Sequence, residues 1–345
     1  MLTLVSAGAA AAQRGEQTTT PPAQQTPRRV PRPGEDQTLS VNVNLVDLLY
    51  TVADRRGKFI TDLKREDFKV YEDDRIQTIT NFASETDLPL TIALVVDTSG
   101  SIRDKLRFEQ EAAIEFFYST LHRGKDKALV ISFDSGVDLL QDFTDNPETL
   151  ADAVRKIRAG GGTSLYDAVY LAVSEKLAEQ PGRLVVILIS DGDDNSSRVS
   201  LTETLELAQR RNVAIYSIST NSSAYFGSRE QDRGDKTLKR FSDETGGRPF
   251  FPEKIQDLAV SFKEIGEELR SQYRLAYIPT NTRPDGTFRK IRIDVANRGY
   301  RIKSRTGYYA PRASAAKRNW GRRGIGGQTP RCGISRRKEI PQRGV

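Results

Sequence analysis

Three short segments of this 345-residue chain are rich in side-chain oxygens and could together bind a cation. The first is Asp97-Thr-Ser-Gly-Ser101, which places one carboxylate and two hydroxyls at alternate positions. Its glycine permits a tight bend, so the three oxygens could face one point. Taken alone, the segment is equally compatible with a strand-to-helix turn in which Ser101 caps the next helix.

The second segment is Gly160-Gly-Gly-Thr-Ser-Leu-Tyr-Asp167. Three successive glycines allow the backbone to approach a ligand closely, and Thr163 then offers a hydroxyl. By itself the segment also fits a flexible loop, with Ser164 as the N-cap of a helix and Asp167 as its capping partner. The two interpretations are compatible, because Ser164 can cap while Thr163 binds a metal.

The third segment, Ser190-Asp-Gly-Asp-Asp-Asn195, is an acidic turn that follows a strongly apolar run. Asp191 is the first carboxylate after that run, and its side chain could reach a metal. Turns rich in Asp and Gly are common at strand ends, so this segment alone does not prove a site. An EF-hand is excluded because no Glu closes the loop at the twelfth position.

The composition limits the chemistry further, because the chain has one His and one Cys. An intrachain disulfide needs two cysteines, and zinc sites built from His and Cys need three or four such ligands. A Ser-His-Asp triad would have to use His122, which lies in a stretch typical of a helix end. A His at such a position more often interacts with the helix dipole than acts as a catalytic base. Any bound metal must therefore be held by oxygen.

The elements that would position these segments can be read from hydrophobic patterning. Continuous apolar runs at 90–96, 128–133, 184–189 and 213–218 indicate strands buried on both faces. Helical periodicity lies between or after them, at about 102–121, 147–158, 164–179, 201–211 and 254–270. This alternation predicts an α/β fold with a doubly wound, mostly parallel sheet. The three oxygen-rich segments would lie at its carboxyl edge, where such sheets bind ligands.

Together, Asp-x-Ser-x-Ser after the first strand, Thr after a glycine turn and Asp after a later strand resemble the von Willebrand factor type A domain. The resemblance runs from about residue 90 to 270, and all five positions match. It implies a Rossmann-like fold with a metal-ion-dependent adhesion site, in which hydroxyls of Ser99, Ser101 and Thr163 hold the metal. Asp97 and Asp191 would act directly or through water. Around these ligands we expect a rim formed by Gly162, Ser164, Asp193 and Asp194.

An all-oxygen site of this kind suits Mg²⁺, with Mn²⁺ or Ca²⁺ as alternatives. Two carboxylates leave the metal with positive charge and an open position, so a carboxylate from a partner protein is the expected occupant. The sequence thus favours a non-enzymatic adhesion module.

A Mg²⁺-dependent phosphoryl-transfer or hydrolytic enzyme is the alternative function. A phosphatase of the haloacid-dehalogenase type would have an Asp where Ser99 stands, and no P-loop motif is present. No general base is evident beside Asp193 or Asp194.

The flanks, 39–88 and 271–310, show period-two alternation typical of antiparallel strands. We expect them to pair with each other, with the α/β domain of 89–270 inserted between them. Pro284-Asp-Gly286 predicts a hairpin turn. The segments Gly57–Glu72 and Gly307–Pro311 resemble motifs of the bacterial VWFA-related proteins, a narrower group.

The two terminal regions and one internal stretch lack the hydrophobic periodicity of helices and strands. Residues 1–13 resemble a clipped secretory signal peptide, which implies a secreted or periplasmic location. Residues 14–38 have the composition of a disordered linker, and the stretch Asn221–Lys236 is either a recognition loop or disordered. No run approaches the ~20 apolar residues that a membrane span requires.

The formal net charge of +7 is concentrated outside the folded region. Residues 311–345 contain ten basic side chains and one acid, whereas 39–310 carries a net charge of −3. Nucleic-acid binding through this tail is a further alternative, but Trp320 alone offers little base stacking. We expect the tail to be disordered and solvated.

Overall fold

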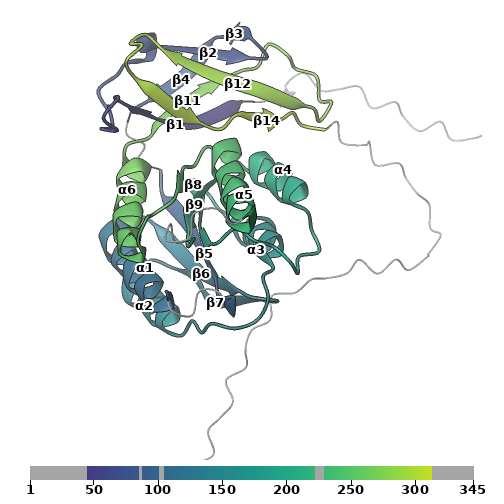
Figure 1. The fold of residues 1–345 in the computed structure, drawn as a ribbon. Coiled ribbons are helices and arrows are strands. Elements are labelled where there is room, and N and C mark those ends of the chain that lie inside the picture. Colours follow the sequence, from purple (N-terminus) through teal and green to yellow (C-terminus); the bar gives the residue numbers. More distant parts are fainter. Residues whose placement is uncertain (1–44, 85–87, 101–104, 222–228, 313–345) are drawn as a thin grey trace, which may run out of the picture. The chain divides into compact units, whose positions relative to one another are not determined.

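The computed structural model describes residues 45–84, 88–100, 105–221 and 229–312 (Figure 1). All of them belong to one unit of the chain that begins at Val43. The expected signal peptide, the linker, Ser101 and residues 313–345 of the basic tail lie outside the described residues.

The central sheet has six strands in the order β10-β9-β8-β5-β6-β7. Its parallel strands are formed by the apolar runs, and every residue of β5 is buried. The strand bounds are β5 Leu90–Asp97, β6 Lys127–Phe133, β7 Val137–Thr144, β8 Arg183–Ser190, β9 Val213–Ser219 and β10 Pro249–Phe250. Only β7 runs antiparallel, at the edge beside β6. The continuous apolar runs became interior strands because helices cover both faces.

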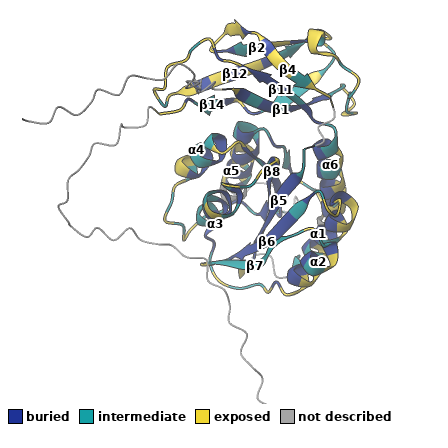
Figure 2. Ribbon diagram, turned by 180° about the vertical axis from the view of Figure 1, so that it is seen from behind, coloured by how far each residue is buried: buried dark blue, intermediate teal, exposed yellow. Residues whose placement is uncertain are grey.

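Two hydrophobic clusters fix the helices on the sheet (Figures 1 and 2). One face packs against α1 (Leu106–Thr120), α2 (Pro147–Arg155) and α6 (Leu258–Arg270). The other packs against α3 (Leu165–Leu171), α4 (Leu201–Arg210) and α5 (Arg229–Thr245). A π-helical turn, Ala172–Leu177, continues α3. The predicted doubly wound fold is confirmed.

The two flanks form a pair of four-stranded sheets, ordered β13-β1-β11-β4 and β14-β12-β2-β3. Their bounds are β1 Val46–Ala53, β2 Phe68–Glu72, β3 Arg75–Gln77, β4 Ile79–Ala83, β11 Tyr273–Tyr277, β12 Phe288–Val295, β13 Arg301–Ser304 and β14 Gly307–Tyr309. Short 3₁₀ turns lie at Arg65–Asp67 and Ile255–Asp257. Strand β1 pairs antiparallel with β11, and β2 with β12. The predicted pairing of the flanks is therefore confirmed.

Aromatic packing joins these two sheets. Tyr50 and Tyr273 stack in one sheet with ring centroids 5.4 Å apart, and Phe68 of the other sheet meets Tyr50 edge-on at 5.2 Å. The Tyr273 hydroxyl also accepts the N–H of Leu63 at 3.0 Å. Residues more than 200 positions apart in the chain thus share one core.

Two predictions need correction. The segment 284–286 is not a hairpin turn between neighbouring strands, because β11 and β12 belong to different sheets. The interpretation of Asn221–Lys236 as loop or disorder is wrong for its second half, since α5 begins at Arg229. That helix is strongly polar, and Leu238 and Phe241 supply its buried apolar contacts in the described residues.

Candidate metal-binding site

The site is built around Asp97, the last residue of β5, whose side chain is fully buried. The Ser99 N–H donates to its Oδ1 at 2.8 Å, and the Ser190 hydroxyl donates to its Oδ2 at 2.7 Å. The Ser190 oxygen in turn accepts the N–H of Gly192 at 3.0 Å. The first and third oxygen-rich segments are thereby joined at the carboxyl ends of neighbouring parallel strands.

The glycine segment is tied to both of the others. The N–H of Gly160 donates to the Thr98 carbonyl at 2.7 Å. Thr163 and Asn195 exchange two hydrogen bonds, from the Thr163 N–H to Asn195 Oδ1 and from the Asn195 N–H to the Thr163 carbonyl, both at 3.0 Å. Thr163 is buried, and its hydroxyl forms no hydrogen bond with any residue that the structure describes.

Close approach of neighbouring segments explains two of the glycines. Gly192 has φ +82°, and a Cβ there would lie 2.2 Å from the carbonyl oxygen of Gly234 in α5. A Cβ on Gly162 would lie 3.0 Å from Ser196 Oγ. Side chains at these positions would push the segments apart, so the glycines keep the segments close.

The electrostatics of Asp97 favour a cation. Burial and the negative charge of Asp191 raise the pKa of Asp97 to about 6, against the lowering effect of its hydrogen bonds to Ser190 and Ser99. Within the described ranges, no Lys, Arg or His lies at ion-pair distance from Asp97. A buried carboxylate of this kind is costly unless a cation neutralises it.

Sequence reasoning missed Glu109, a second buried carboxyl group in the first turn of α1. It is 1% exposed, and neither carboxylate oxygen has a hydrogen-bond partner among the described residues. Burial, with the charges of Asp97 and Asp191, raises its pKa to about 8, whereas Lys105 lowers it. The signal was present in the sequence, because Glu109 interrupts the apolar helix face that contains Ala112, Ala113, Phe116 and Phe117.

The expected rim residues have varied partners. The N–H of Asp193 donates to Asp191 Oδ1 at 3.1 Å, and its carboxylate lies 3.9 Å from Arg233. Asp194 accepts hydrogen bonds from the Tyr166 N–H at 3.2 Å and the Ser197 hydroxyl at 2.5 Å. Asp194 therefore stabilises the start of α3.

The expected capping pair at α3 is wrong. Ser164 occupies the N-cap position, but its hydroxyl donates to the carbonyl of Ser135 at 3.1 Å. Asp167 instead accepts the backbone N–H groups of Arg198 and Val199. Because these residues anchor neighbouring loops, they fix the glycine segment and the acidic turn to α3.

A cation at this place would need hydroxyl ligands. In the described part of the chain, no three His, Cys, Asp or Glu side chains converge in a way that could hold a metal. The buried Asp97, Ser99 and Thr163, with the partly buried Asp191, present carboxylate and hydroxyl oxygens from three joined segments. This donor set fits a hard divalent cation rather than zinc in a His or Cys site.

The parallel sheet, with helices on both faces and three joined loops at its carboxyl edge, defines a Rossmann-like α/β domain. Residues 92–193 match the family model described as the von Willebrand factor type A domain. Over these residues the match confirms the resemblance that the sequence motifs predicted.

One curated relative is a protein of Borreliella burgdorferi described as uncharacterized. It is 24% identical over 217 residues, covering 60% of this chain and 62% of the relative. The match thus spans less than two thirds of that protein's own length.

Several solved structures are similar in fold. One is proximal thread matrix protein 1 from the mussel byssus with a zinc-occupied MIDAS motif, with a TM-score of 0.46 and 16% identity, covering 56% of this chain and 48% of that one. The vWF domain of the pilus tip protein Mfa5 from Porphyromonas gingivalis has a TM-score of 0.43 and 13% identity, and the match covers 54% of this chain and 96% of that one. An aerotolerance-related membrane protein from Bacteroides fragilis has a TM-score of 0.42 and 13% identity, and the match covers 52% of this chain and 98% of that one.

Among the helices that the structure describes, none combines the length and apolar character needed to cross a membrane.

Proposed function

We propose that the chain is a non-enzymatic module that binds a partner protein through a divalent cation. Its ligands would be Asp97, Ser99, Ser101, Thr163 and Asp191. The observation that carries the proposal is the fully buried Asp97 carboxylate, which accepts hydrogen bonds from the neutral donors Ser99 and Ser190 and is raised in pKa by the nearby charge of Asp191. Such an arrangement repels itself unless a cation neutralises it.

The chemistry of the donors suggests Mg²⁺, with Mn²⁺ or Ca²⁺ as alternatives, because all the ligands are oxygens. The five proposed ligands leave one position of a six-coordinate ion open, and the three hydroxyls among them add no negative charge. A partner carboxylate from Asp or Glu would complete the coordination. The proposed interaction takes place outside the cytoplasm, a location supported by the resemblance of residues 1–13 to a secretory signal peptide.

Isothermal titration of the full chain with Mg²⁺ and Mn²⁺ tests the metal site. We expect binding by the wild type and its loss in Asp97→Ala, with Asp97→Asn as a variant that keeps the side-chain shape. Asp152→Ala is the matched control, since Asp152 lies on the exposed side of α2. Equal heats from wild type and both Asp97 variants, each folded by circular dichroism, would reject the metal assignment.

The partner chemistry can be tested on the Mn²⁺-loaded chain by water-proton relaxation. A peptide with a central Asp should displace bound water and lower the relaxation rate, whereas the same peptide with Asn should not. A pull-down from the cell envelope, with and without EDTA, then identifies the partner. Relaxation that responds equally to both peptides would contradict carboxylate bridging.

The enzyme alternative has weaker support in the geometry. Asp194 is engaged at the start of α3, and Asp193 lies near Arg233, so neither is placed as a general base. Turnover of generic phosphate esters that disappears in Asp97→Ala would nevertheless reverse this preference.

A further inference from the structure

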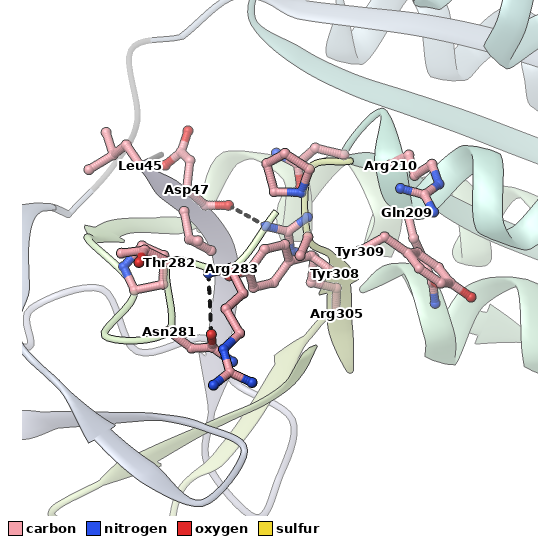
Figure 3. A pocket seen from close by; sticks show the side chains of 15 residues that line it. Leu45, Asp47, Gln209, Arg210, Asn281, Thr282, Arg283, Arg305, Tyr308 and Tyr309 are labelled. Carbon is pink, nitrogen blue, oxygen red and sulfur yellow. Dashed lines mark hydrogen bonds between the residues drawn. The ribbon is translucent and has the colours of Figure 1, made fainter. Parts of the chain in front are cut away.

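A cavity of about 250 Å³ lies at the C-terminal end of α4, the end away from the candidate metal site (Figure 3). We call it the β1–α4 pocket and define it by Asp47, Arg210, Arg283, Arg305, Tyr308 and Tyr309. Helix α4 starts just after the acidic turn and ends in this pocket at Arg210. Ten helical residues span about 15 Å, so the two sites are separate.

The lining of the pocket is rich in positive charge. Arg210 pairs with Glu206 at 2.7 Å, and the carboxylate of Asp47 pairs with Arg274 at 2.8 Å. Those charges are therefore balanced within the protein. Arg283 and Arg305 have no carboxylate at ion-pair distance in the ranges described, and the negative charge of Asp47, which is already paired with Arg274, acts on Arg305 only from a longer distance.

Arg305 is the more unusual of the two, because its side chain is 8% exposed. Its Nη2 donates to the backbone carbonyl of Asp47 at 2.9 Å, but its Nε has no hydrogen-bond partner among the described residues. Burial lowers its pKa to about 10. A buried cation without a directly paired carboxylate is costly, and an anion in the pocket would offset that cost.

Aromatic and proline side chains line the pocket beside these groups. The Arg305 guanidinium lies 5.6 Å from the ring of Tyr308, and the Arg210 guanidinium lies 4.4 Å from the ring of Tyr309. The Tyr308 hydroxyl is already used, since it donates to Glu72 Oε2 at 2.9 Å. Pro279 and Pro311 add apolar surface. The pocket thus combines cationic groups with apolar walls.

We propose that the β1–α4 pocket binds a small organic anion. Its carboxylate or phosphate group neutralises Arg305 and Arg283, and its planar or apolar body packs against Tyr309 and the prolines. The volume is below the range of about 300–1,000 Å³ typical for drug-sized ligands, so the ligand is small.

Calorimetry on the full chain tests this binding in buffer freed of divalent cations, which keeps the candidate metal site from binding the probes. The probes are phenyl phosphate, benzoate, inorganic phosphate and neutral benzamide. We expect saturable binding of phenyl phosphate or benzoate, at least tenfold weaker binding of inorganic phosphate, and none of benzamide. The tighter of the two aromatic probes identifies the acid group. Absence of saturable binding by both aromatic anions would overturn the proposal.

Variants then locate the binding. Arg283→Ala removes an exposed cation and should weaken binding about tenfold or more, as loss of a charged hydrogen bond does. Tyr309→Ala should erase the advantage of phenyl phosphate over inorganic phosphate. Arg298→Ala is the control, because Arg298 is exposed and outside the pocket, and it should bind as the wild type does. Equal weakening by Arg283→Ala and Arg298→Ala would show non-specific attraction and reject the pocket.

Discussion

The hydroxyl of Ser190 donates to Oδ2 of Asp97 at 2.7 Å, across the ends of the neighbouring strands β8 and β5. Both side chains are fully buried. This bond fixes one carboxylate oxygen, while the N–H of Ser99 fixes the other. The orientation of the central carboxylate is therefore set by the sheet before any cation binds, which reduces the ordering that binding requires.

Ser190→Ala should weaken both folding and metal binding. The variant leaves a buried carboxylate oxygen without its donor and the N–H of Gly192 without its acceptor. We expect a loss of about 1–3 kcal/mol in the free energy of unfolding, measured in urea without metal. Mn²⁺ affinity should fall several-fold by calorimetry. Ser119→Ala, on the exposed side of α1, serves as the control. Unchanged Mn²⁺ affinity in Ser190→Ala would show that this bond does not position Asp97.

Glu109 gives the metal-free chain a distinctive pH dependence. Its folded pKa of about 8 exceeds the ordinary value of 4.5, so the folded chain binds this proton more tightly than the unfolded chain. The free energy of unfolding should therefore fall as pH rises from about 5 to 8, with a slope of up to about 1.4 kcal/mol per pH unit from this group. Urea unfolding at several pH values measures the slope.

Glu109→Gln should remove that slope, because glutamine does not titrate. At pH 8 the metal-free variant should be more stable than the wild type, whereas at pH 4 the two should be similar. Glu111→Gln is the control, since Glu111 lies on the exposed side of the same helix and pairs with Arg107. Parallel pH curves for wild type and Glu109→Gln would contradict this account.

Asn195→Ala tests the tie between the glycine segment and the acidic turn. The amide oxygen of Asn195 accepts the Thr163 N–H, so its loss frees the backbone that carries the Thr163 hydroxyl. Because Asn195 is exposed, we expect a change in unfolding free energy of about 1 kcal/mol or less, but roughly tenfold weaker Mn²⁺ binding. Asn297→Ala removes a similar exposed acceptor in the second flank and should leave Mn²⁺ affinity unchanged. If both variants bind Mn²⁺ equally well, Asn195 has no role in the site.

The positions of the candidate ligands could be predicted from the sequence. The apolar runs predict parallel strands, and the carboxyl ends of parallel strands lie at one edge of the sheet. The residues that orient the site could not be predicted in the same way. Ser190 ends an apolar run and resembles any strand-terminal serine, and Asn195 acts through backbone groups on another loop. Only Glu109 carried a readable signal, as a charge on an otherwise apolar helix face.

Parts of the fold could be predicted from the sequence and parts could not. Long apolar runs predicted the parallel strands, and the alternating flanks predicted antiparallel strands that pair with each other. Helix α5 was missed because Leu238 and Phe241 are too few to establish a helical period in a polar segment. The pairing partners of β11 and β12 depend on contacts more than 200 residues away, which a local turn signal at 284–286 does not contain.

Glu72 allows a test of how strongly side-chain hydrogen bonds hold the two flanks together. The hydroxyls of Tyr277 and Tyr308 both donate to Glu72 Oε2 at 2.9 Å, so one buried carboxylate of the first flank joins two strands of the second. Glu72→Ala leaves both hydroxyls without this acceptor and should lower the free energy of unfolding by about 2–4 kcal/mol in urea.

Glu72→Gln is the matched control for that loss, because its amide keeps an acceptor oxygen of nearly the same shape. It should cost less than Glu72→Ala, by at least about 1 kcal/mol. Mn²⁺ affinity should be unchanged in both folded variants, since the two flanks supply none of the proposed metal ligands. Equal destabilisation by the two substitutions would mean that Glu72 acts through its negative charge rather than as the acceptor that joins the flanks.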